Sequence, residues 1–176
     1  MRGSIVAKIL VVLWFVVSSL VPVPASASKL SRLTEAEYAH YRALRVFMDD
    51  DQRSEWLKLK TTEERDAWLH EHNLWDRFYS HPAEVRQQIV EGDVELGWSR
   101  DMVYMAWGPP FQKQRLTGRE ASRSELLVYR FELDKEGVAS PLVGKHADYQ
   151  AVGSHQTELI MDDDVVAEMK EKDHFE

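Results

Sequence analysis

The chain contains no cysteine. This absence excludes thiol catalysis, in which a cysteine thiolate is the nucleophile. It also excludes disulfide bonds and the attachment of a lipid at a cysteine. Without disulfide bonds, the stability of the folded chain must come from packing. Six tryptophans, six tyrosines and six phenylalanines supply large side chains for a core.

Positive charge is also scarce. There are 22 Lys and Arg residues against 30 Asp and Glu residues, a formal net charge of −8. An acidic chain repels polyanions, which argues against binding to nucleic acid or to an anionic membrane surface through bulk charge.

Residues 1–27 have the three parts of an export signal. Arg2 and Lys8 precede an apolar run over residues 9–17, and Ala25-Ser26-Ala27 supplies the small residues that signal peptidase requires. We therefore predict that the mature protein begins at Ser28. The alternative is an uncleaved membrane anchor, but a span needs about 20 mainly apolar residues and this run is shorter.

Residues 28–92 have a helical pattern. Capping boxes that begin at Thr34 and Thr61 predict two helix starts, and Asn73 predicts a break or bend in the second helix. Pro82 suits the first position of a further helix, which Gly92 ends. Trp68 and Trp75 lie in this helical region and are expected to fill the core. The same is expected of Trp107, farther along the chain.

Residues 93–170 predict one more helix followed by strands. Ser99 caps a short helix that extends to Trp107, and Gly108 closes it. Alternating side chains then predict a strand over residues 125–133, and a hairpin turns around Asp163. Residues 138–153 read as a long loop, with a short strand as an alternative, and residues 171–176 as a charged tail. Helices followed by antiparallel strands predict an α+β fold with two layers.

The histidines give no motif for catalysis or metal binding. His70 and His72 lie two apart on a helix and so point to different faces, as solvated surface residues do. His146, Asp148 and His155 fall in the loop region, but their spacing fixes no metal geometry. They leave open the alternative of an exported hydrolase or metal-dependent enzyme. We predict instead that no residue is catalytic and that the chain needs no cofactor or metal.

Consecutive acids occur at residues 162–164. A calcium loop alternates its ligands and needs a glycine at the sharp turn. Three acids in a row between two strands therefore predict a solvated hairpin turn.

Residues 97–110, GWSRDMVYMAWGPP, resemble the signature of the SmpA/OmlA family, the BamE-type small proteins of the bacterial outer-membrane assembly machinery. The family pattern is a glycine, a methionine, a serine or threonine cap, a valine, a leucine-glycine pair and a proline. The positions that carry the resemblance, with tryptophan in place of the methionine and of the leucine, are Gly97, Trp98, Ser99, Val103, Trp107, Gly108 and Pro110.

The resemblance implies a three-stranded antiparallel sheet with helices on one face, and a protein that binds other envelope proteins at the periplasmic face of the outer membrane. Membrane association would come only through partners or an uncleaved signal. Family members are typically lipoproteins, and this chain lacks the cysteine for acylation. A weaker resemblance, to the GWxTD domain, rests on Gly97-Trp98, Asp101, Tyr104 and Gly108-Pro109-Pro110 and requires a gap.

Overall fold

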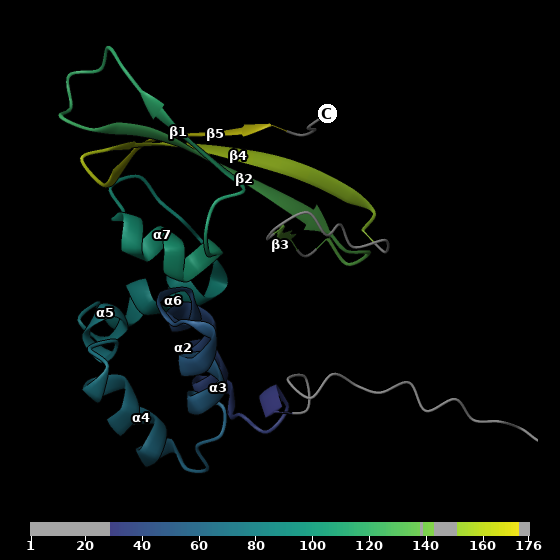
Figure 1. Ribbon diagram of the computed structural model, residues 1–176. Coiled ribbons are helices and arrows are strands. Elements are labelled where there is room, and N and C mark those ends of the chain that lie inside the picture. The colour runs from purple at the N-terminus through teal and green to yellow at the C-terminus, as the bar shows by residue number, and fades with distance from the viewer. Residues whose placement is uncertain (1–28, 138, 143–150, 173–176) are drawn as a thin grey trace, which may run out of the picture.

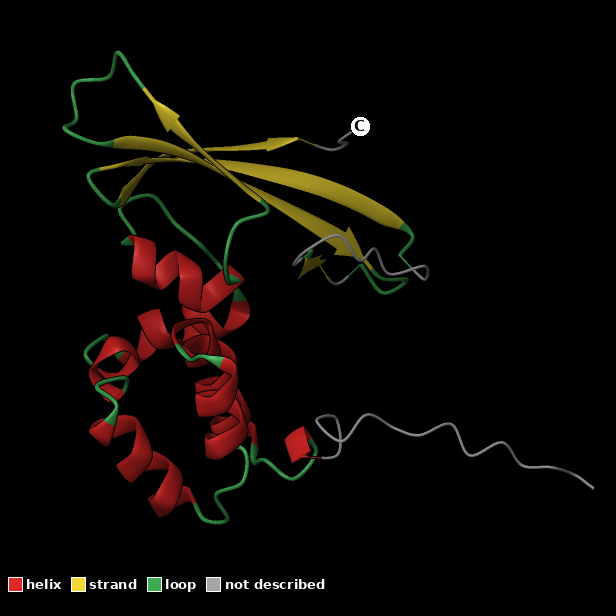
Figure 2. Cartoon of the chain, in the orientation of Figure 1, coloured by secondary structure: helices red, strands yellow, loops and turns green. Residues whose placement is uncertain are grey.

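The computed structural model describes residues 29–137, 139–142 and 151–172. The helices precede the strands and lie on one face of a five-stranded antiparallel sheet (Figure 1; Figure 2). The predicted α+β class is confirmed.

The helical layer contains six described α-helices and one 3-10 turn. Their bounds are α2 Glu35–Leu44, η1 Arg45–Phe47, α3 Asp50–Trp56, α4 Thr62–Glu71, α5 Trp75–Tyr79, α6 Ala83–Glu91 and α7 Arg100–Trp107. In Figure 1, α7 lies directly against the sheet, and α3 and α4 lie farthest from it.

Local sequence signals determine most helix ends. The capping boxes at Thr34 and Thr61 are both formed, which confirms the two predicted starts. Asn73 adopts a φ of 55° between α4 and α5, so the predicted break is present. Gly92 ends α6 in the left-handed conformation, with a φ of 86°. Pro82 is the residue before α6 and not its first member, because its ψ of 156° is not helical.

The sheet has more strands than the three that were predicted. Its strands are β1 Gln112–Leu116, β2 Ser124–Leu133, β3 Ala139–Pro141, β4 Gly153–Asp162 and β5 Val165–Lys172. The order is β1-β2-β4-β5, and β3 also pairs with β2. The predicted strand over residues 125–133 is β2, and the predicted hairpin is β4 with β5. The sequence of β1, QKQRL, has no alternation, and its backbone pairing with β2 makes it a strand.

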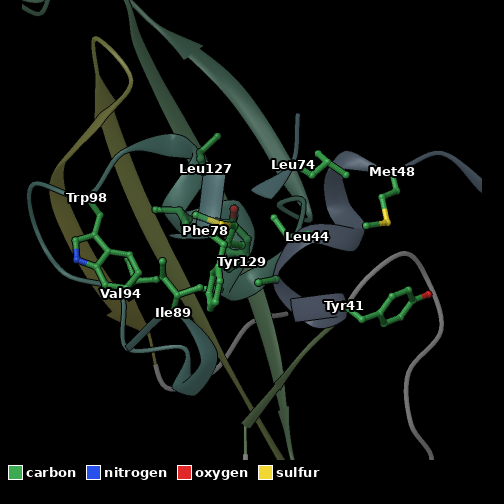
Figure 3. Packing of buried hydrophobic residues seen from close by; sticks show 14 of the residues in the cluster. Tyr41, Leu44, Met48, Leu74, Phe78, Ile89, Val94, Trp98, Leu127 and Tyr129 are labelled. Carbon is green, nitrogen blue, oxygen red and sulfur yellow. The ribbon is translucent and has the colours of Figure 1, made fainter. Parts of the chain in front are cut away.

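One hydrophobic cluster joins the two layers (Figure 3). Leu127, Tyr129 and Phe131 alternate along β2 and are at most 4% exposed, as the period of two predicts. Trp68 is buried as predicted, whereas Trp75 and Trp107 are half-buried at the margin of the cluster. None of the helices in the described ranges is long and apolar enough to cross a membrane.

Candidate functional site

The described part of the chain contains an open groove of about 1120 Å³. Its lining residues come mainly from α2 with η1 and from the end of α7 with β3. Its lining is dominated by aromatic and arginine side chains, namely Tyr38, Tyr41, Phe47, Tyr104, Trp107, Arg42, Arg45, Arg53 and Arg77.

Helix α7 builds one wall of the groove. The Oγ of Ser99 accepts a hydrogen bond from the Met102 N–H at 3.4 Å, which confirms the predicted cap. At the other end, Gly108 takes a φ of 79° and donates its N–H to the Tyr104 carbonyl at 2.8 Å. Because Pro109 follows, the helix stops there and presents Tyr104 and Trp107 at its final turn.

Trp107 is fixed in place. Its ring meets Tyr129 and Phe131 edge to face, at centroid distances of 5.0 and 5.1 Å. Its Nε1–H donates to the Gly92 carbonyl at 2.8 Å. A Cβ at Gly92 would lie 3.4 Å from that nitrogen, so the glycine lets α6 approach the ring closely. Two ring contacts and one hydrogen bond therefore hold the Trp107 ring in the wall of the groove.

The arginines that line the groove differ in their partners. Arg77 pairs with Asp101, and its guanidinium lies 4.5 Å from the centre of the Phe47 ring. Arg53 pairs with Asp50 at 2.8 Å. The side chains of Arg42 and Arg45 have no hydrogen bond or ion pair to any residue in the described ranges, although Arg42 is half-buried.

Residues Gly97 to Arg100 attach α7 to the β4–β5 hairpin. Gly97 N–H donates to the Val166 carbonyl and Val166 N–H donates to the Trp98 carbonyl, both at 2.8 Å. The Arg100 guanidinium binds Glu125 at 2.5 Å and Asp164 at 2.6 Å. Gly97 and Trp98 are thus hydrogen-bonded to the hairpin, and Val103 is fully buried in the core.

The Glu125 carboxylate pairs with Arg100 at the start of α7. Burial raises the pKa of Glu125, but hydrogen bonds from Arg100 and Arg123, with their charges, outweigh burial and hold that pKa below its ordinary value. Glu125 is thus ionised at neutral pH and holds the start of α7 on the sheet.

Asp163 and Asp164 form the predicted hairpin turn and Asp162 ends β4, but these acids are not simply solvated. Asp163 and Asp164 have φ values of 46° and 67°. Asp162 accepts hydrogen bonds from Arg119 and Ser124, and Asp164 binds Arg100. The turn is ion-paired to the rest of the sheet and to α7, which the sequence pattern did not indicate.

The alternative catalytic residues are not brought together in the described ranges. His146 and Asp148 lie outside them. The placement of His155 in a loop was wrong, because it lies in β4 and stacks on Phe131 with centroids 4.7 Å apart. Paired strand backbone fixes it there. His70 is exposed but stacks on Trp75 with centroids 4.4 Å apart, and His72 stacks on Trp68 at 3.6 Å, so neither ring is purely solvated as predicted. The described residues contain no cluster of three or more potential metal ligands.

One polar cluster was missed altogether. His40 lies between Trp75, Phe78 and Tyr79, and its Nε2 is hydrogen-bonded to the Tyr79 hydroxyl. Burial lowers the pKa of His40 below its ordinary value, and nearby carboxylates offset only part of that shift. The sequence spacing could have indicated that His40 faces the core, because it lies one helical turn before the buried Leu44.

Comparison of this chain with known protein families, with curated proteins and with solved structures finds no match.

Proposed function

We propose that this chain is an exported, non-catalytic protein of the bacterial cell envelope that binds other envelope proteins through the groove between α2 and α7. The observation that carries the proposal is the lining of that groove. It concentrates tyrosine, tryptophan and arginine, the residue types that contribute most to protein–protein binding energy. Tyr38 is 48% exposed there, which leaves a large aromatic surface free to be covered.

The rigidity of the wall supports the same role. A binding surface that is already ordered loses less conformational entropy when a partner docks. Trp107 is held by two ring contacts and a hydrogen bond, and α7 is held by the ion pairs of Arg100. The aromatic anchor therefore does not have to be ordered at the moment of binding.

Sequence features support the location and the kind of function. The pattern of residues 1–27 favours export, and the resemblance of residues 97–110 to the SmpA/OmlA signature favours a binding module linked to outer-membrane assembly or integrity. Most residues of that motif hold α7, while Trp107 and Gly108 also line the groove. We infer that most of the motif shapes the groove, and that Trp107 contacts the partner together with the flanking aromatic and arginine side chains.

In-cell photo-cross-linking tests the proposal. A photoreactive amino acid replaces Tyr38 in the groove or, as the control, Gln114, which is exposed on β1. Irradiation of intact cells should give a discrete adduct with another envelope protein from position 38 and none from position 114. Equal adducts from both positions, or none from either, would contradict the proposal.

Fractionation and amino-terminal sequencing of the same cells test export. The expected result is an envelope protein that begins at Ser28. Recovery of the protein in the cytoplasm with Met1 intact would remove the envelope part of the proposal.

A further inference from the structure

Resting on the proposed function, we propose that the groove binds an acidic, extended segment of the partner protein, with Arg42 and Arg45 holding its carboxylates. Both side chains line the groove, and neither has a partner among the residues that the structure describes. The other two arginines of the groove are already neutralised, Arg77 by Asp101 and Arg53 by Asp50. Two arginines and one carboxylate, Glu91, are left without an ion-pair partner among the described lining residues, so the unpaired groups carry a net positive charge.

The sign of the groove is opposite to that of the chain. The whole sequence has a formal net charge of −8, yet four arginines line the groove against two acids, Glu91 and Asp101. A guanidinium that is partly removed from water gains most from an anion that it can bind with two parallel hydrogen bonds. Arg42 is half-buried in the lining of the groove, so a carboxylate is the complementary group.

The size of the groove favours a chain segment over a small anion. Pockets for small molecules are typically about 300–1,000 Å³ and largely enclosed. This groove has about 1120 Å³ and is open. Its tyrosines and Trp107 offer apolar surface along its length, on which the aliphatic or aromatic residues of a peptide can lie between its acids. A nucleic acid, in contrast, would bring many phosphates against an acidic protein surface.

Selection from a random peptide library tests the proposal on the purified protein. Peptides that bind should be enriched in Asp and Glu, and their affinity should fall as salt rises from about 0.05 to about 0.3 M. Arg42→Gln with Arg45→Gln should weaken a selected peptide by about tenfold, the sum of two partly exposed ion pairs. The charge-matched control, Lys113→Gln with Arg115→Gln on exposed β1, should change its affinity by less than about twofold.

A second variant tests the effect of the groove's shape on binding separately from the effect of its charge. Ala139→Trp adds bulk at the β3 side of the groove without changing its charge, and it should abolish binding. Arg45→Gln alone, at an exposed position, should weaken binding without altering the melting temperature.

Several outcomes would overturn the inference. Selected peptides without acids, equal weakening by the β1 control, or equal binding of a random-sequence oligonucleotide would each remove the acidic ligand. If Ala139→Trp blocks binding while the two arginine substitutions do not, the groove remains the site and the proposed function stands. Failure to select any peptide, with a partner still captured from position 38, would also refute only the acidic segment. If no peptide is selected and no partner is captured from position 38, the proposed function is refuted as well.

Discussion

A buried ion pair between α2 and α4 gives the sharpest stability prediction. Glu37 and Arg65 have side chains that are 5% and 8% exposed, and the carboxylate accepts a hydrogen bond from the Arg65 guanidinium at 2.6 Å. The same carboxylate accepts from Thr62 Oγ1 and from the Thr34 N–H, both at 2.8 Å. Arg65 also donates to the Leu59 carbonyl at 2.5 Å. The pair therefore joins the start of α2 to the first turns of α4.

Removing one partner leaves the other charge buried. Glu37→Ala or Arg65→Ala should each lower the free energy of unfolding by about 3–5 kcal/mol, because the remaining ion has no counter-charge. Since a domain of this kind has about 5–15 kcal/mol of stability in total, either change consumes a large share of it. Glu37→Leu together with Arg65→Met should cost only about 1 kcal/mol, mainly the lost capping bond to Thr34.

Urea unfolding followed by tryptophan fluorescence measures these costs. Trp56 and Trp68 are buried in the same layer and report its loss directly. Asp50→Asn, which breaks a pair whose carboxylate is 97% exposed, is the control and should cost less than about 1 kcal/mol. If each single change also costs less than about 1 kcal/mol, or if the two costs simply add when Glu37→Ala and Arg65→Ala are combined, the pair is not a coupled buried unit.

The pH dependence provides an independent check. Burial raises the pKa of Glu37, but the hydrogen bonds from Thr34 and Thr62 and the charge of Arg65 outweigh it, so the net pKa lies below its ordinary value of 4.5. A lowered carboxyl pKa means that the unfolded chain binds the proton more readily. The stability from Glu37 is therefore complete above about pH 4.5 and is lost as the pH falls through the folded pKa.

Four further predictions concern single positions. Trp107→Ala should cost about 3 kcal/mol, since it removes two ring contacts and leaves the Gly92 carbonyl without its donor. Gly108→Ala should cost about 1–2 kcal/mol from its positive φ alone, because no atom lies within 4 Å of the added Cβ. His155→Ala should cost about 1 kcal/mol through the lost stacking on β2. His40 has a lowered pKa, so the unfolded chain gains its proton first and stability should fall as the pH drops below about 6.5.

Thermal and urea unfolding measure all four. The His40→Gln variant should lose the pH dependence just below pH 6.5 while keeping the one below pH 4.5 that belongs to Glu37. A wild-type melting temperature that stays constant from pH 7 to pH 5 would refute the argument from His40. Unchanged unfolding of Trp107→Ala, with loss of the captured partner, would make Trp107 an interface residue and not a wall of the fold. Loss of function in His155→Ala at normal stability would favour the enzyme alternative.

The sequence by itself determined what depends on residues close along the chain. Both predicted capping boxes, the break at Asn73 and the glycine stop after α6 involve groups within about four positions of one another, and the structure has all of them. The alternation of apolar side chains in β2 could also be recognised from the sequence, because one face of that strand is buried against the helices. These local signals were sufficient for the α+β class.

Only the tertiary structure decided which residues far apart in the sequence contact one another. Strand β1 has no hydrophobic pattern and exists because β2 offers it backbone partners. Glu37 and Arg65 are 28 positions apart, and His40 and Tyr79 are 39 apart, so no spacing rule could pair them. The groove is formed by α2, α7 and β3, which are far apart in sequence, and the unpaired state of Arg42 follows from how they pack. Such contacts are set by the packing of whole elements, and for that reason the candidate site could not be read from the sequence although the fold class could.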